Sequence, residues 1–302
     1  MSLLTFRRPR PAAPPPLAAF LQGCSIEVMP RTAAKIADFR ALLPAGTRVY
    51  VAHIEGTPLP DMVATAARLR AEGFEPMPHL PARVIPDRAT LADLIARYTG
   101  EAGVREALLL GGSPAKPAGS LHSSMQLLET GLFDGFRRLH VAGHPEGNRD
   151  IDPRGGDAQV MAALRWKADF AERSDAEMAI VTQFAFDARP VIAWAERLRT
   201  AGLRLPIHVG LAGPAKLQTL IRFAVACGVG PSLAVLQRRA RDVTKLVKPF
   251  EPTEIATQLA LHQAETPDSL IAGAHLFPLG GIEASARWAL DAAGTSPAAE
   301  QD

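Results

Sequence analysis

Cysteine is scarce in this chain of 302 residues, and long apolar runs are missing. Cys24 and Cys227 are its only cysteines, too few for a disulfide framework. We expect both thiols to be reduced, as in cytoplasmic proteins. No apolar stretch approaches the ~20 residues of a membrane-spanning helix, and the N-terminal region lacks the apolar core of a signal peptide. These absences predict a cytoplasmic protein that does not enter a membrane.

An excess of charge of one sign is also missing. The chain carries 33 lysines and arginines against 31 aspartates and glutamates, for a formal net charge of +2. Its basic residues are spread along the sequence, apart from Arg7, Arg8 and Arg10. Bulk charge therefore gives no argument for a nucleic-acid partner, and we expect none.

The usual signatures of metal sites and dinucleotide folds are absent. The sequence has no His-x-His pair, no His-Glu-x-x-His and no paired cysteines. We therefore interpret its histidines as hydrogen-bonding pocket residues and predict no metal. It also lacks the glycine fingerprint of a Rossmann fold. A metal-dependent barrel hydrolase is kept as an alternative hypothesis. Its candidate ligands are His53, His79, His144, His208 and His275.

What the sequence does have is an alternation of short apolar runs with longer helical patterns. With 47% hydrophobic and 21% charged residues, it can bury one sizeable core. We predict strands over residues 25–28, 48–53, 75–79, 107–110, 139–142, 179–183, 207–209 and 274–277. We predict helices over residues 32–43, 61–72, 89–98, 120–129, 157–172, 190–201 and 215–227, and after residue 282.

Eight strand–helix alternations favour a parallel sheet, and eight units in a chain of this length fit a closed (β/α)8 barrel better than an open sheet. We expect a single α/β TIM barrel over residues 23–293. Residues 1–22 are basic and then proline-rich, which predicts a flexible arm. Residues 294–302 are expected to be a disordered tail. Residues 231–269 break the rhythm and predict extra helices inserted before the last strand.

Reactive side chains end several of these strands, and in a parallel barrel all such strand ends open on one face. Glu27 ends the first strand among apolar neighbours, which would desolvate its carboxylate and raise its pKa. Such an acid can donate a proton near neutral pH. A glutamate held in an ion pair is an equally good interpretation.

Three further strand ends carry hydrogen-bonding groups. In the fourth, the glycines let backbone N–H groups approach a ligand, although a nonspecific turn explains this segment equally well. The sixth is a buried strand that stops in polar groups, as substrate-reading strands of barrel enzymes do. The segments read Leu110-Gly111-Gly112-Ser113-Pro114, Val141-Ala142-Gly143-His144-Pro145-Glu146-Gly147 and Val181-Thr182-Gln183-Phe184-Ala185-Phe186-Asp187.

Five segments together resemble the catalytic barrel of 5,10-methylenetetrahydrofolate reductase, in that family's order, from about Gly23 to Leu290. The fifth- and sixth-strand segments quoted above are the most specific. The chain is similar to the short bacterial form, without the large regulatory domain of eukaryotic members. The other three segments are Ser25-Ile26-Glu27-Val28-Met29-Pro30, Pro78-His79-Leu80 and Gly112-Ser113-Pro114.

This resemblance implies a flavin-dependent oxidoreductase of one-carbon metabolism and methionine biosynthesis. NADH or NADPH would pass hydride to FAD, and the reduced flavin would pass it to methylenetetrahydrofolate, giving 5-methyltetrahydrofolate. The direction stays open, because both directions share one transition state. Family members are usually multimers, so a homo-oligomer is expected.

The resemblance also implies roles for particular residues. Glu27 matches the family's general acid, which opens the methylene bridge to a reactive iminium. Gln183 matches the glutamine that contacts both folate and nicotinamide, and its amide can donate and accept hydrogen bonds. The implied FAD contacts are His53, His79, Gly112, Ser113, Ala142, His144, Asn148 and Lys167. The implied substrate contacts are Glu27, Ser113, Gln183, Phe184, Leu217 and His275.

The chain departs from the family pattern at several of these positions. Ser113 stands where the family has an acid beside the flavin and the pterin. His144 replaces an aromatic residue, and Asn148 replaces the usual histidine. The loss of the acid motivates a further alternative, a noncatalytic relative that binds folate or flavin.

Overall fold

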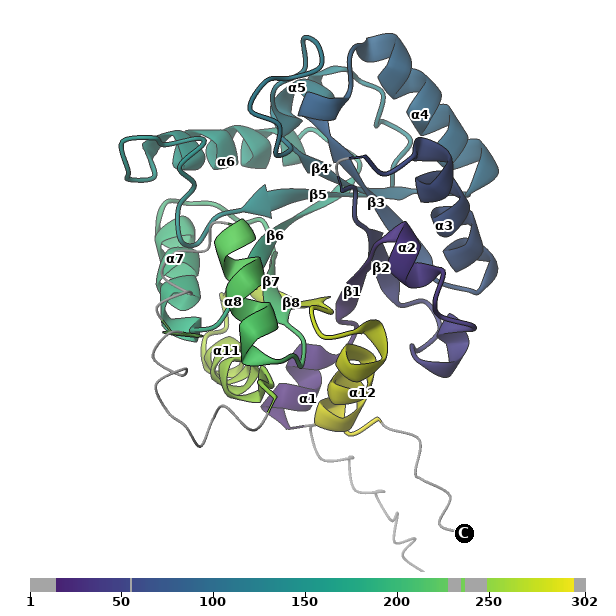
Figure 1. Ribbon diagram of the computed structural model, residues 1–302. Coiled ribbons are helices and arrows are strands. Elements are labelled where there is room, and N and C mark those ends of the chain that lie inside the picture. Colours follow the sequence, from purple (N-terminus) through teal and green to yellow (C-terminus); the bar gives the residue numbers. More distant parts are fainter. Residues whose placement is uncertain (1–14, 55, 228–234, 237–248, 296–302) are drawn as a thin grey trace, which may run out of the picture.

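Eight parallel strands close into a barrel in sequence order, with β1 paired to both β2 and β8 (Figure 1). The computed structural model describes residues 15–54, 56–227, 235–236 and 249–295. The closed parallel barrel with intervening helices confirms the predicted TIM barrel. The strands are β1 (Ser25–Val28), β2 (Arg48–Val51), β3 (Glu75–Pro81), β4 (Glu106–Leu110), β5 (Arg138–Gly143), β6 (Glu177–Ala185), β7 (Ile207–Ala212) and β8 (Ile271–Phe277).

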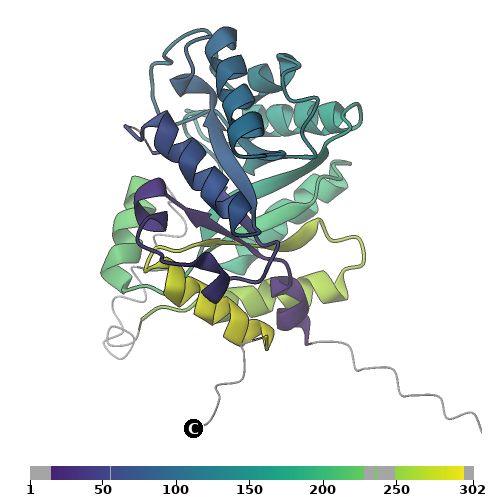
Figure 2. The same ribbon diagram turned by 90° about the vertical axis from the view of Figure 1, so that its right-hand side faces the viewer.

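Helices connect the strands and cover the outside of the barrel (Figures 1 and 2). They are α1 (Pro16–Leu21), α2 (Pro30–Ala33), α3 (Leu59–Ala71), α4 (Arg88–Glu101), α5 (Ser124–Glu129), α6 (Ala158–Ala171), α7 (Ala188–Thr200), α8 (Leu217–Ala226), α11 (Thr253–Glu265) and α12 (Ile282–Ala293). Short 3₁₀ turns lie at Phe39–Ala41 and Ala82–Val84. Among the described residues, none of the helices combines the length and apolarity that crossing a membrane requires.

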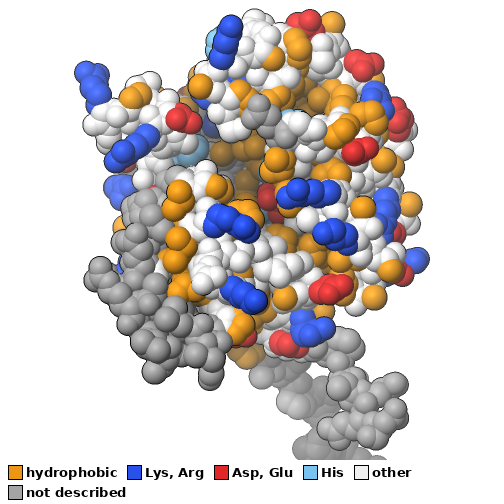
Figure 3. Space-filling model, in the orientation of Figure 1, with side chains coloured by type: hydrophobic (Ala, Val, Ile, Leu, Met, Phe, Trp, Pro, Cys, Tyr) orange, Lys and Arg blue, Asp and Glu red, His pale blue; other side chains and the backbone are white. Residues whose placement is uncertain are grey.

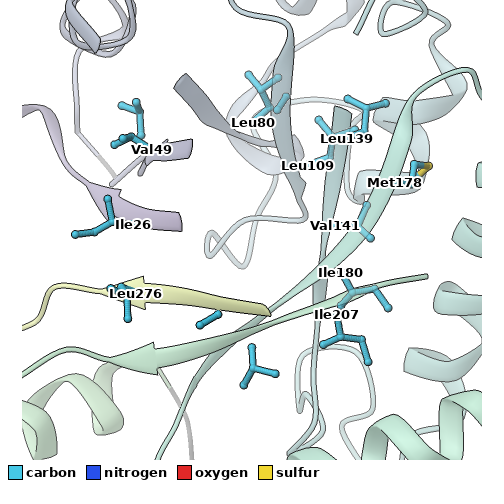
Figure 4. Packing of buried hydrophobic residues seen from close by; sticks show 14 of the residues in the cluster. Ile26, Val49, Leu80, Leu109, Leu139, Val141, Met178, Ile180, Ile207 and Leu276 are labelled. Atoms are coloured by element: carbon cyan, nitrogen blue, oxygen red, sulfur yellow. The ribbon is translucent and has the colours of Figure 1, made fainter. Parts of the chain in front are cut away.

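Successive strand residues alternate between the barrel interior and the surrounding helices. Outward side chains such as Ile26, Val49 and Leu109 are buried in the main core, which Figure 4 shows from close by. A smaller apolar cluster of Tyr50, Met77, Leu108 and Val181 contains the intervening strand positions. The helix-facing positions thus form the main core, and the interior is left to a second, more polar set of side chains.

An ion network closes the end of the barrel where the strands begin. Glu106 is fully buried, and its carboxylate accepts from Arg48 Nε at 2.6 Å, Arg138 Nη1 at 2.6 Å and Arg137 Nη2 at 2.5 Å. Burial alone would raise the pKa of Glu106, but these arginines outweigh it and lower the pKa. A buried charge is tolerable only with such compensation, so we call this network the floor of the barrel.

The helix predicted over residues 32–43 is wrong. Only α2 and a 3₁₀ turn form there, because tertiary contacts satisfy the backbone instead. Arg68 donates to the carbonyls of Ala33 and Ile36, and Glu72 accepts from Phe39 N. Side-chain partners on α3 therefore replace the intrahelical bonds that a longer helix would have made.

The flexible arm predicted over residues 1–22 is wrong in its last part. Residues 16–21 form α1, which packs against α11 and α12 (Figures 1 and 2). Phe20 and Leu21 are buried there, and the burial of two large apolar side chains favours order. Residues 1–14 and 296–302 lie outside the described residues. Of the insertion predicted over residues 231–269, the structure describes α11, while 231–234 and 237–248 fall outside the described residues.

Candidate functional site

The strands end on the face from which α2 and α8 continue, and we call this face the mouth of the barrel. Figure 3 looks onto it in the orientation of Figure 1. The face is hollowed near its centre, mostly between hydrophobic side chains, with an acidic side chain inside the hollow. Glu27, His79, Gln183 and His275 lie in the C-terminal halves of four different strands, so the barrel brings together residues that are far apart in the sequence.

Glu27 lies between two histidines. Its Oε2 is 3.3 Å from His79 Nε2 and 4.0 Å from His275 Nε2, and its side chain is 20% exposed. The expectation of a raised pKa for Glu27 is wrong. Burial does raise it, but attraction to the two histidine rings outweighs burial and lowers the pKa to about 2. Glu27 is therefore a carboxylate at neutral pH in the free protein.

A column of polar side chains continues from Glu27 into the barrel. Ser25 Oγ is 2.9 Å from His275 Nδ1, and Tyr50 Oη makes a short hydrogen bond with His140 Nδ1. The His140 ring stacks on His208 with 5.0 Å between centroids. We call this set the interior column. It consists of His275, Ser25, Tyr50, His140 and His208.

The sequence interpretation missed two members of this column, Tyr50 and His140. The available signal was the strand period of two, since both residues follow an inward-facing arginine by two positions. Arg48 precedes Tyr50, and Arg138 precedes His140. A polar residue at every second strand position indicates a polar interior.

A β-bulge sets the position of Gln183. The pairing of β6 with β7 shifts between Val181 and Phe184, and Thr182 Oγ1 accepts from Gly210 N at 2.9 Å. A Cβ on Gly210 would lie 2.6 Å from the carbonyl oxygens of Thr182 and Gln183, so only glycine permits this approach. Gln183 Oε1 accepts from Phe184 N at 3.1 Å, while its Nε2 makes no hydrogen bond to a described residue. Bulges beside active sites commonly re-aim a side chain.

The loop after β4 carries Gly112 and Ser113. Gly112 has a φ of +96°, which favours glycine. Arg83 holds this loop, since its backbone N donates to Gly111 O at 2.9 Å and its Nη1 lies 3.4 Å from Gly112 O. The Ser113 residue is exposed. The loop therefore presents a small hydroxyl rather than a charge.

A buried cation lies on α6, next to the end of β5. Lys167 is 7% exposed, and it makes no hydrogen bond or ion pair to a described residue. Burial lowers its pKa to about 8. Burial and the charge of Lys167 together lower the pKa of His144 to about 4. A buried ammonium without a carboxylate partner is suited to receive an anionic group.

The neighbouring loop is held by its own side chains. Asn148 Oδ1 accepts from Asp150 N at 2.9 Å, which forms an Asx turn. Asp152 accepts from Gln159 N and Val160 N at the start of α6. Ala142 is half-buried, at an inward position of β5. Asn148 thus has a structural role in this loop in addition to its proposed contact.

Three other predicted site residues are partly or fully buried. Phe184 and Leu217 are buried in a second apolar cluster beneath α8, together with Leu220 and Phe250. Their side chains contribute packing there. His53 is half-buried just after β2, and burial is the main cause of its lowered pKa.

The histidines do not gather as metal ligands. Within the described part of the chain, no group of three histidine, cysteine, aspartate or glutamate side chains is arranged to hold a metal ion.

The chain is similar to curated proteins and to solved structures. No family profile matches the chain. Methylenetetrahydrofolate reductase 1 of Schizosaccharomyces pombe is 31% identical over 151 residues, which cover 46% of this chain. The aligned region covers 23% of that relative, so the chain matches less than a quarter of its length.

Both solved structures are 12% identical to the chain. An uncharacterized protein from Clostridium thermocellum, described as binding two copies of 5-methyl-5,6,7,8-tetrahydrofolic acid, has a TM-score of 0.62. The match covers 91% of this chain and 97% of that one. A psychrophilic family 10 xylanase has a TM-score of 0.44, over 92% and 98% of the two chains, which is too low to support an argument. The chain is therefore similar in sequence to a methylenetetrahydrofolate reductase over 46% of its length, and the match to the Clostridium thermocellum structure shows a shared barrel fold.

Proposed function

We propose that this protein interconverts 5,10-methylenetetrahydrofolate and 5-methyltetrahydrofolate, with FAD as its cofactor and NAD(P)H as its electron partner. The observation that carries the proposal is the Glu27 carboxylate, held by His79 and His275 at the barrel mouth. The similarity to a methylenetetrahydrofolate reductase supports it. The folate bound by the structural neighbour agrees with this substrate class.

A carboxylate in this position suits the charge changes of the reaction. Opening the methylene bridge places a positive charge on the iminium nitrogen N5 and requires a proton at N10. An ionised Glu27 in a partly desolvated site stabilises that positive charge. When the substrate displaces water, burial increases and raises the carboxylate's proton affinity. Glu27 would then hold the proton that N10 receives in one direction and returns in the other.

Gln183 and Ser113 would position the pterin. The Nε2 of Gln183 has no described partner, so it can donate to a ring carbonyl or nitrogen at the mouth. Ser113 contributes a neutral hydroxyl where the family has an acid. A missing negative charge near the flavin would raise the reduction potential of bound FAD, because the reduced flavin is anionic.

The residues present fit the phosphate part of a flavin dinucleotide. When bound, FAD would supply the hydride-transfer chemistry. Lys167 would hold its pyrophosphate, with His144 and the half-buried Ala142 beside it. The burial of Lys167 in the free protein makes its charge costly until an anion arrives. We therefore propose that this cation is part of the FAD site.

The deciding experiment uses the purified full chain with added FAD, without oxygen. We expect a yellow protein whose flavin absorbance is bleached separately by NAD(P)H and by 5-methyltetrahydrofolate. Glu27→Gln should slow the folate half-reaction by about 10²- to 10⁴-fold and leave the nicotinamide half-reaction unchanged. Glu129→Gln is the matched control, since Glu129 is exposed at the end of α5. A chain that takes up FAD but never exchanges electrons with a folate would refute the proposal.

One observation favours a second candidate, a barrel that binds folate without catalysis. Ser113 is exposed on its loop and supplies no charge. In that case 5-methyltetrahydrofolate should bind, as calorimetry would detect, and Glu27→Gln should change its affinity without any redox activity to lose.

A further inference from the structure

The interior column is more polar than a barrel core requires. Ser25, His140 and His275 are at most 1% exposed, and Tyr50 is completely buried. Three strands place a histidine at an inward position of the barrel. Apolar residues could fill these positions without needing hydrogen-bond partners. The proposed chemistry uses only the top of this column, so its lower part needs a separate explanation.

Contacts connect the column from top to bottom. Glu27 Oε2 lies 4.0 Å from His275 Nε2, a gap that a small rotation or one water closes. His275 Nδ1 is 2.9 Å from Ser25 Oγ. The Tyr50 ring lies 4.2 Å from the His275 ring, which places Tyr50 next to the His275–Ser25 pair. Below Tyr50, the column continues through His140 and His208.

Tyr50 is hydrogen-bonded to His140 Nδ1, and His140 Nε2 is a buried nitrogen without a partner among the described residues. His140 stacks on His208, whose ring is only partly buried. A buried nitrogen without a partner is costly, and a water molecule that hydrogen-bonds to it removes that cost. Such a water is favoured here because the neighbouring ring is partly exposed. The column therefore ends beside a partly exposed ring that water can contact.

We propose that Tyr50 and His140 extend the Glu27–His275–Ser25 contacts into a proton relay, which links Glu27 to water beside His208. This inference rests on the proposed function. During that reaction the folate and the flavin would cover the mouth, while Glu27 must regain or lose one proton in each turnover. A path through the barrel interior allows this exchange while the mouth is occupied.

The proton balance follows one direction of hydrogen bonding. In the proposed starting state His140 Nδ1–H donates to Tyr50 Oη and Ser25 O–H donates to His275 Nδ1. Small rotations bring Tyr50 O–H to Ser25 and His275 Nε2–H to Glu27. Each proton moves one step along its bond, so Glu27 gains a proton and His140 Nε2 takes one from water. No electron moves. When the mouth opens again, each proton moves one step back. His275 Nε2 takes a proton from water at the mouth and His140 Nε2 returns one to water beside His208, which restores the starting state.

The surroundings keep the column neutral. Burial, the largest effect, lowers the pKa of His140, and His208, Arg48, Arg138 and His275 lower it further. Burial raises the pKa of Tyr50 most strongly. Glu106 balances the arginines at the floor. Neutral groups of this kind pass a proton along without storing it.

The first test does not depend on activity. Long-range ¹H–¹⁵N spectra of the ¹⁵N-histidine-labelled protein report which ring nitrogen carries each proton. His140→Gln and His275→Gln assign the signals. We expect His140 as the Nδ1–H tautomer and His275 as the Nε2–H tautomer. If His140 carries its proton at Nε2, then Tyr50 donates to His140 and cannot donate to Ser25. That result overturns the relay.

The second test uses the FAD-loaded protein and separates a relay from simple packing. We compare Tyr50→Phe, His140→Gln and His140→Phe, with Met77→Leu as a control in the same interior layer. The glutamine keeps a donor for Tyr50 but cannot take up a proton at its far end. We expect all three column variants to slow the folate half-reaction by about 10²-fold, with a larger solvent deuterium effect and an unchanged nicotinamide half-reaction.

The two tests keep the relay and the proposed function apart. If His140→Gln keeps wild-type rates while His140→Phe does not, the column is structural and the relay is wrong. If the wild-type protein has no folate activity, the proposed function fails, and the histidine tautomers still decide whether the chain of hydrogen bonds exists.

Discussion

Gly210 is the position where one added methyl group should disturb both the fold and the site. It lies in β7 opposite the bulge of β6, and a Cβ there would be 2.6 Å from two backbone carbonyl oxygens. Neither oxygen can move away like the end of a flexible side chain. Gly210→Ala must therefore push the two strands apart at the bulge and stretch the bond from Gly210 N to Thr182 Oγ1, which is 2.9 Å long.

The loss in free energy of unfolding can be estimated from two effects. Overpacking of a filled interior costs about 1–3 kcal/mol, and the loss of a buried hydrogen bond costs about 1 kcal/mol. We expect Gly210→Ala to lower the free energy of unfolding by about 2–4 kcal/mol. For a chain of this size, each 1 kcal/mol corresponds to roughly 2–4 °C in Tm. The expected fall in Tm is therefore about 4–16 °C.

The assay is thermal and urea unfolding of the full chain, followed by folate binding to the folded variant. Because Gln183 belongs to the same bulge, its displacement should weaken folate binding without affecting FAD uptake at α6. Gly100→Ala is the control, since a Cβ there meets nothing within 4 Å and the residue lies inside α4. That control should be neutral or slightly stabilising. An unchanged Tm for Gly210→Ala would show that the bulge tolerates a side chain, and the reasoning would fail.

Three further predictions concern charged groups. A fall in the pKa of Glu27 from 4.5 to about 2 corresponds to about 3 kcal/mol of stability; because the folded pKa is depressed, this stability is present above pH 4.5 and lost as the pH falls towards 2. Urea titrations should therefore find Glu27→Gln less stable than wild type at pH 7, with the difference vanishing near pH 2, and a constant difference would refute the argument. Lys167→Met should weaken FAD binding at least tenfold in a fluorescence titration, whereas Lys35→Met should not; since the pKa of Lys167 is about 8 in the free protein and a bound phosphate would raise it, wild-type affinity should also fall as the pH rises above 8. Glu106→Gln should lower the free energy of unfolding by about 3–5 kcal/mol by leaving the partly buried Arg48 and Arg138 uncompensated, and a loss below 1 kcal/mol would mean that the floor is hydrated.

The strands could be predicted because their signal is local. Strand β1 has the predicted bounds, and β2 begins at Arg48 as predicted, since short apolar runs between turn residues determine both. The segment after α2 could not be predicted, because Arg68 and Glu72 satisfy its backbone from another helix. The order of α1 depends likewise on apolar surfaces that come more than 200 residues later in the chain.

The meeting of Glu27, His79 and His275 at the strand ends could be predicted, but their electrostatics could not. Apolar sequence neighbours indicated a desolvated Glu27, and the burial is real. The sign of its pKa shift depends on His79 and His275, which β3 and β8 bring to it. Likewise, Gln183 was evident from its motif, whereas the bulge that positions it depends on contact with Gly210.

The packing of α1 has a consequence for synthesis in the cell. Phe20 and Leu21 are among the first described residues to leave the ribosome, yet the helices that bury them end near residue 293. At translation rates of about 5–20 residues per second, these side chains wait on the order of 10–50 s for their partners. The barrel also remains open during that time, because β1 cannot pair with β8. The nascent chain should therefore depend on chaperones at its N-terminal end, and this dependence should end once α12 has been synthesised.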